Sequence, residues 1–145
     1  MPYTTKNNIL NMNFDFALDK EYEINLEGLS GEFKIIGDDN NIIQESNVYI
    51  DDWLNALVEG FIILESENSN QRIEMDLESE PDPLELELRG EFLTIIYKNN
   101  SVKVNSFQEA KTKLKNKISL IFNELVSVPN WEEDINLKPL INYLK

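Results

Sequence analysis

The chain has neither cysteine nor histidine among its 145 residues, and the two absences exclude several kinds of chemistry. Without cysteine there are no disulfides, no thiol catalysis and no zinc–thiolate sites. Without histidine the chain lacks the commonest general base and the commonest transition-metal ligand. Its 5 glycines form no GxGxxG or GxxxxGK[ST] phosphate-binding loop. We therefore expect no cofactor, no bound metal, no small-molecule substrate and no enzymatic activity.

Long apolar runs are also missing. The most apolar stretch, ALVEGFIIL at residues 56–64, contains Glu59 and is far shorter than the about 20 residues that a membrane span requires. The N-terminal residues lack the basic segment followed by an apolar run that is typical of a signal peptide. The sequence therefore predicts a soluble, cytoplasmic protein whose residues 1–145 form a single domain.

Basic residues are scarce, with 13 Lys and Arg against 27 Asp and Glu and a formal net charge of −14. This charge disfavours contact with nucleic-acid phosphates and with anionic membranes. It favours a basic protein partner, because opposite electric fields accelerate encounter. The main basic cluster is predicted to be a solvated helix face, since no aromatic residues interleave it: Lys111, Lys113, Lys115 and Lys117.

The first half of the chain predicts strands followed by a helix. Two alternating apolar runs indicate an N-terminal hairpin over residues 13–27, with Phe16 opposite Ile24. A third strand is expected from Glu32, followed by a turn at residues 37–41 and short extended pieces up to Ile50. A shorter helix is expected to start near residue 52, capped by Asp51 or Asp52. Gly60 is a possible end of this helix, so residues 61–64 fit either helix or strand.

The second half predicts a four-stranded meander over residues 71–105. A tight turn at Gly90 and Glu91 sets three cross-strand pairs: Leu88 with Leu93, Leu86 with Ile95, and Leu84 with Tyr97. A turn at Asn99 and Asn100 would then set Tyr97 opposite Val102 and Ile95 opposite Val104. Ser106 and Glu109 form a capping box that opens an amphipathic helix over residues 106–126. The predicted fold class is α+β, a mostly antiparallel sheet packed by this long C-terminal helix.

The segment EMDLESEPDPLELE, residues 74–87, contains seven acidic residues and no basic one. If the apolar residues of its two strands face a core, the acidic ones face outward. One register sets Asp76 against Glu85 and Glu74 against Glu87, which gives an anionic sheet face bordered by Phe92, Thr94 and Ile96. The candidate partner-binding residues are Glu74, Asp76, Glu78, Glu80, Asp82, Glu85 and Glu87.

Two explanations of this acidic segment stay open. Charged residues can simply protect sheet surfaces and edges from aggregation. Glutamate, however, has poor strand propensity, and like charges directly opposite one another are destabilising. Arg72 and Arg89 are placed to relieve only the end of the predicted ladder. The cost of repeated glutamates favours a surface that meets a cationic partner.

In size, charge and architecture, and above all in its acidic segment at residues 74–87, the chain resembles bacterial immunity proteins. Those proteins neutralise toxin domains of contact-dependent inhibition and related polymorphic toxin systems, and the toxins are often nucleases with basic clefts. The resemblance implies a binding protein that docks acidic side chains on a basic toxin domain. Two alternatives remain: a DNA mimic or other small acidic inhibitor, and a hydrolase that uses paired carboxylates.

Overall fold

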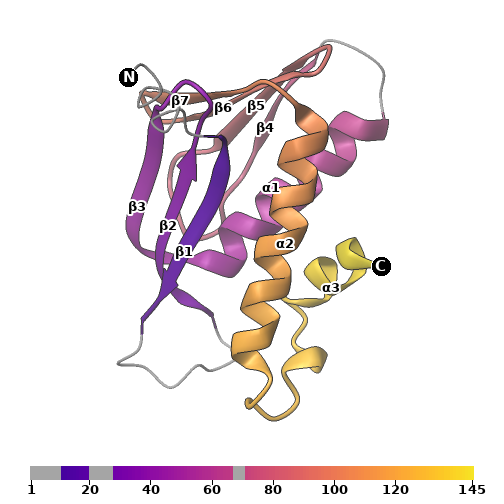
Figure 1. Ribbon diagram of the computed structural model, residues 1–145. Coiled ribbons are helices and arrows are strands. Elements are labelled where there is room, and N and C mark those ends of the chain that lie inside the picture. The colour runs from indigo at the N-terminus through magenta and orange to yellow at the C-terminus, as the bar shows by residue number, and fades with distance from the viewer. Residues whose placement is uncertain (1–10, 20–27, 67–70) are drawn as a thin grey trace, which may run out of the picture.

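The computed structural model describes residues 11–19, 28–66 and 71–145 and shows an α+β fold with two antiparallel sheets (Figure 1). The first sheet has the order β1-β2-β3, formed by β1 (Asn13–Leu18), β2 (Ser30–Ile36) and β3 (Ile42–Tyr49). The second has the order β4-β5-β6-β7, formed by β4 (Gln71–Met75), β5 (Leu84–Arg89), β6 (Phe92–Tyr97) and β7 (Asn100–Val104).

Helices complete the fold. Helix α1 (Ile50–Ser66) connects the two sheets in the chain, and α2 (Phe107–Leu125) follows the second sheet. A short 3-10 turn, η2 (Trp131–Glu133), and α3 (Lys138–Leu144) end the chain. The capping box is confirmed, because the Ser106 side chain accepts a hydrogen bond from the backbone N–H of Glu109. No helix in the described part of the chain combines the length and the apolar character needed to cross a membrane.

Strand β1 coincides with the first arm of the expected N-terminal hairpin. In the described part of the chain β1 pairs with β2, and Phe16 lies opposite Phe33. The second arm of the expected hairpin falls within residues 20–27, which lie outside the described residues. The strand expected from Glu32 is β2, and the extended pieces expected up to Ile50 form one strand, β3.

The register of the second sheet is confirmed at one hairpin and wrong at the next. Strands β5 and β6 pair as predicted, from Leu84–Tyr97 to Leu88–Leu93, and Gly90 adopts the left-handed φ of 61° that its turn requires. Between β6 and β7, however, Ile95 lies opposite Val102 and Leu93 opposite Val104. Lys98, with a φ of 54°, takes the turn position expected for an asparagine, which shifts the register by two residues.

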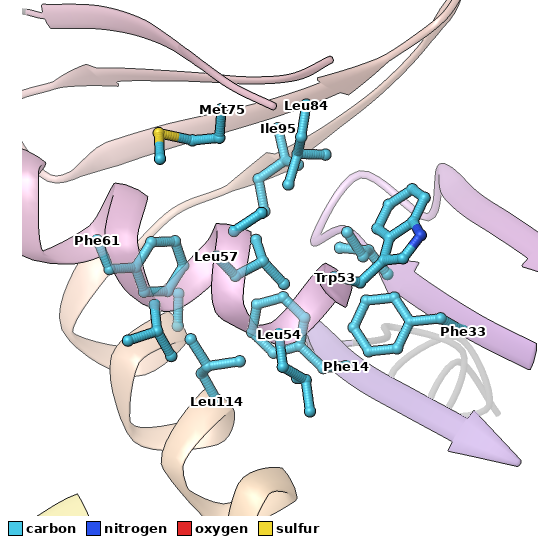
Figure 2. Close-up of a cluster of buried hydrophobic side chains, with 14 of the residues drawn as sticks. Phe14, Phe33, Trp53, Leu54, Leu57, Phe61, Met75, Leu84, Ile95 and Leu114 are labelled. Carbon is cyan, nitrogen blue, oxygen red and sulfur yellow. The ribbon is translucent and has the colours of Figure 1, made fainter. Parts of the chain in front are cut away.

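Helix α1 packs against strands of both sheets and supplies the centre of the core (Figure 2). The Trp53 ring lies 5.7 Å from the Phe33 ring of the first sheet and 4.7 Å from the Tyr97 ring of the second. Further along α1, the Phe61 ring lies 6.4 Å from the Phe14 ring and 5.2 Å from the Phe107 ring of α2. Burying each such side chain contributes about 1.5–3 kcal/mol.

Residues 61–64 belong to α1, which continues to Ser66. Gly60 does not end the helix. It lies against the second sheet, where an added Cβ would contact the Leu86 side chain and lie 3.2 Å from Met75 Cγ. The absence of a side chain at this position therefore lets the helix approach the sheet closely.

Asp38 joins the two sheets at their common corner. Its backbone N–H donates to the carbonyl of Lys103 in β7 at 2.8 Å. Its carboxylate accepts from the backbone N–H of Met12 at 2.8 Å and of Asn105 at 2.7 Å. The backbone N–H of Gly37 donates to the carbonyl of Asn41 at 2.9 Å, which confirms the turn at residues 37–41.

Candidate functional site

The outer face of strands β4 and β5 carries three of the predicted acidic residues, but in a different register from the one expected. Glu74 lies directly opposite Glu85, and Arg72 lies opposite Glu87. The predicted pairs of Asp76 with Glu85 and Glu74 with Glu87 are wrong. A shift of two residues keeps every side chain on the same face, so the apolar alternation fixed the face and not the register.

The predicted anionic sheet face is wrong, because two of the glutamates on this outer face form ion pairs with arginines. Arg72 Nη2 lies 3.0 Å from Glu85 Oε1, and Arg89 Nη2 lies 2.9 Å from Glu87 Oε2. The hydrogen bond and the charge of Glu85 raise the pKa of Arg72. Lys103 lies on the same face, opposite Thr94. The predicted border is present, with Phe92 63% exposed beside the partly buried Thr94 and Ile96.

The other predicted acids lie in the β4–β5 loop and point to two separate places. Burial raises the pKa of the Tyr97 hydroxyl to about 12, and the charges of Glu80, Glu45 and Asp82 add to the effect. Glu80 and Asp82 therefore lie near Tyr97. Asp76 and Glu78 instead line a cavity beside the first turns of α1.

This acidic cavity has a volume of about 390 Å³ and is the strongest candidate for a binding site. Five carboxylates line it, and no lysine or arginine does. The lining residues are Tyr49, Asp51, Asp52, Asn55, Ala56, Glu59, Asp76, Glu78, Ser79 and Asn136. They come from the end of β3, from α1, from the β4–β5 loop and from the segment before α3.

Asp52 builds the wall between α1 and the β4–β5 loop. Its carboxylate accepts hydrogen bonds from the backbone N–H groups of Glu78 at 3.0 Å and Ser79 at 2.9 Å, and from the Ser79 hydroxyl. A carboxylate that accepts several hydrogen bonds holds its donors firmly. The loop that carries Asp76 and Glu78 is therefore fixed to the start of the helix.

Asp51 also lines the cavity and is only 6% exposed. Its Oδ1 accepts a hydrogen bond from the backbone N–H of Leu29 at 3.0 Å. Burial raises the pKa of Asp51 above its ordinary value, the N–H of Leu29 opposes this, and the charges of Asp52 and Asp134 add to it. A cation placed in the cavity would relieve this destabilised carboxylate.

The expected cap of α1 is wrong in position. The helix begins at Ile50, so Asp51 and Asp52 belong to its first turn. Their side chains bond to Leu29 and to the β4–β5 loop. Acidic residues in the first turn still favour the helix, because they lie at the positive end of its dipole.

The arrangement suits a cationic group with several hydrogen-bond donors better than a metal ion. Among residues 11–19, 28–66 and 71–145, no group of three or more acidic side chains is placed to hold a metal. An ammonium or guanidinium group can instead pair with carboxylates around the cavity. Tyr49, 48% exposed, offers an aromatic ring on which such a cation can stack.

A second hollow, of about 580 Å³, lies between the end of α2 and α3. It is more apolar and is lined by Phe122 and Trp131, whose rings lie 4.9 Å apart, with Ile141 and Leu144. Lys138, Lys145 and Glu132 also line it, so it lacks the single sign of charge found in the acidic cavity.

The sequence pattern indicated Asp76 and Glu78 as binding residues but gave no indication of the α1 side of the acidic cavity. Asp51 and Asp52 were recognised as residues at the start of a helix, and Glu59 and Asn136 received no functional role. The signal for Glu59 was present, because it lies one helical turn beyond Asn55 and about two turns beyond Asp52 on the same face. The approach of the β4–β5 loop to that face has no local signal in the sequence.

Comparison of the chain with protein-family models, with curated proteins and with solved structures gave no match in any of the three.

Proposed function

We propose that the chain is a binding protein whose acidic cavity receives a lysine or arginine side chain of a basic protein partner. The observation that carries the proposal is the lining of the cavity, in which Asp51, Asp52, Glu59, Asp76 and Glu78 surround one hollow without a basic residue. A protein with a net charge of −14 attracts such a partner from a distance.

The geometry supports a receptor for one inserted side chain. The walls are fixed, because Asp52 holds the loop and Leu29 holds Asp51. A preformed cavity avoids the entropy cost of ordering its walls when the partner binds. Glu59, Asp76 and Glu78 are exposed, so they are accessible to an approaching cation.

The biological role that we propose is that of a bacterial immunity protein, which neutralises a toxin domain by occupying its basic surface. Small size, acidity and an α+β fold support this role, because the immunity proteins that the sequence resembles share these features. A DNA mimic is less well supported, because Arg72 and Arg89 interrupt the carboxylates along β4 and β5. A mimic of the phosphate backbone requires an uninterrupted series of negative charges.

The test uses the toxin domain encoded beside the gene in its native genome, purified as a catalytically inactive variant. Glu59→Lys and Asp76→Lys reverse two exposed charges of the cavity without removing Asp52 or Asp51. We expect each change to weaken binding in calorimetry by about tenfold or more, since unpaired charges at an interface cost several kcal/mol. The affinity should also depend less steeply on salt.

Glu124→Lys is the matched control, because Glu124 is an exposed residue of α2 that does not line the cavity. It makes the same change in net charge and should leave most of the affinity intact. Protection of cells that express the active toxin should follow the same order. Wild-type protection by the Glu59→Lys, Asp76→Lys double variant would refute the cavity as the binding site.

A further inference from the structure

Strand β4 forms the edge of the second sheet. It pairs with β5 on one side, and no strand of the described residues lies on its other side. In the described part of the chain, residues 71–75 form no backbone hydrogen bonds with turns or loops. An edge of this kind presents N–H and C=O groups that are ready to pair with another strand.

The hairpin geometry identifies which residues present those groups. Arg89 and Phe92 close a two-residue turn, so they form a hydrogen-bonded pair. Because such pairs alternate along antiparallel strands, Leu86 directs its backbone groups toward β4 and bonds with Ile73. Arg72 and Glu74 therefore direct their N–H and C=O groups to the open edge.

The same two residues carry opposite charges on the outer face. Arg72 is paired with Glu85, yet its side chain is 56% exposed. Glu74 lies opposite Glu85, a carboxylate, and forms no ion pair with a lysine or arginine of the described residues. The edge therefore offers one accessible cation and one carboxylate that faces a like charge.

We propose that two copies of the chain associate through β4, as antiparallel strands centred on Ile73, to form one continuous sheet. In this register Arg72 of one copy lies opposite Glu74 of the other, and the twofold axis repeats the pair. Each Arg72–Glu74 pair also exchanges two backbone hydrogen bonds, because both residues face the edge. Glu74 thereby gains an ion pair, which the described residues of its own sheet do not form with it.

The charges select this register over its neighbours. A shift of two residues in one direction would set Glu74 against Glu74, and a shift in the other direction would set Arg72 against Arg72. Both put like charges directly opposite one another, which is destabilising. A shift of one residue turns the backbone groups away from each other. The five-residue strand is short, so we expect a dimer that dissociates on dilution.

A charge-swap experiment tests the pairing, with sedimentation velocity over a concentration series as the measurement. Arg72→Glu and Glu74→Arg each place like charges across the twofold axis, so each should raise the dimer dissociation constant about tenfold or more. An equimolar mixture of the two variants restores both opposite-charge pairs and should dimerise as wild type does. The double variant in one chain should also recover.

Lys103→Glu is the matched control, because Lys103 lies on the same outer face but on β7, at the opposite side of the sheet. It changes the net charge as Arg72→Glu does and should leave the dimer intact. Thermal melting of every variant establishes that the fold is retained.

Cross-linking gives an independent test in a chain that has no cysteine of its own. In the proposed register Ile73 faces Ile73 in a non-hydrogen-bonded pair, with Cα atoms about 4.5 Å apart. That separation is within the range of a disulfide. Mild oxidation should therefore join two Ile73→Cys chains covalently, whereas Thr94→Cys, on the central strand β6, should stay monomeric.

A wild-type protein that is monomeric at every concentration, with no cross-link through Ile73→Cys, would overturn the proposal. If β4 instead pairs with a strand of a different protein, both single variants should weaken that complex and their mixture should not restore it. That outcome would also overturn self-association. Neither result depends on the acidic cavity, so the two proposals stand or fall separately.

Discussion

The carboxylate of Asp52 holds Ser79 by both its backbone N–H, at 2.9 Å, and its hydroxyl. The two residues are 27 positions apart, and their contact ties the start of α1 to the β4–β5 loop. Because that loop carries Asp76 and Glu78, the contact fixes two walls of the acidic cavity relative to each other.

Asp52→Ala should release the β4–β5 loop. The variant loses three hydrogen bonds to a charged acceptor, and we expect a loss of about 1–2 kcal/mol in the free energy of unfolding. Urea denaturation measures that loss, and faster hydrogen exchange at the Glu78 and Ser79 amides locates it. Glu124→Ala is the control, and equal exchange in both proteins would contradict a role for Asp52 in holding the loop.

Gly60→Ala should destabilise the protein even though alanine favours helices. The new Cβ would contact the Leu86 side chain, which is fully buried, and would lie 3.2 Å from Met75 Cγ. Overpacking costs about 1–3 kcal/mol and exceeds the gain of about 1 kcal/mol in helix propensity. Leu86→Val shortens the side chain that the new Cβ would contact, so Gly60→Ala should cost less stability in the Leu86→Val protein than in the wild type. A double-mutant cycle measured by urea denaturation tests this difference. A stabilised Gly60→Ala protein would show that α1 does not lie this close to the sheet.

The pKa of Asp51 predicts a change of stability with pH. Burial raises its pKa in the folded state above 3.8, so the folded protein binds the proton more tightly than the unfolded chain. The contribution to stability is full below the unfolded pKa, and it is lost as the pH rises through the folded pKa. Asp51→Asn keeps an oxygen that can accept from Leu29 and removes the titration.

The wild-type protein should therefore lose stability relative to Asp51→Asn as the pH increases from about 3.8 through the folded pKa. The measurement is the difference in free energy of unfolding between the two proteins at each pH, which cancels the other carboxylates. A difference that does not vary with pH would show that Asp51 titrates alike in both states.

Ser106→Ala should destabilise α2 by about 1 kcal/mol, because the Ser106 side chain accepts from the Glu109 N–H at 3.2 Å. Thr112→Ala is the control within the same helix, since the Thr112 hydroxyl donates only to the carbonyl of Gln108. Thermal unfolding compares the two variants, and an equal fall in melting temperature would argue against the cap.

The sequence predicted the parts of the fold that depend on local chemistry. Ser106 and Glu109 gave the start of α2, and Gly90 gave the β5–β6 register, because each position has a backbone requirement that few residue types meet. The β6–β7 register was wrong because a shift of two residues leaves Leu93, Ile95 and Tyr97 facing the core in either case.

Long-range approaches were the part that the sequence could not supply. Gly60 was a possible helix end, and only its contact with Leu86 shows why a glycine lies inside a helix. The acidic cavity likewise depends on the β4–β5 loop meeting the first turn of α1. Asp51 and Asp52 therefore looked like ordinary helix-start residues.

The position of α1 has a consequence for how the protein unfolds. Each sheet covers its apolar face with the same helix, through Phe33 on one side and Tyr97 on the other side of Trp53. Neither sheet can keep a closed core once α1 leaves, so the two sheets should lose their structure together. Tryptophan fluorescence, measured in a Trp131→Phe variant so that Trp53 alone emits, and far-ultraviolet circular dichroism should therefore report one coincident, cooperative transition.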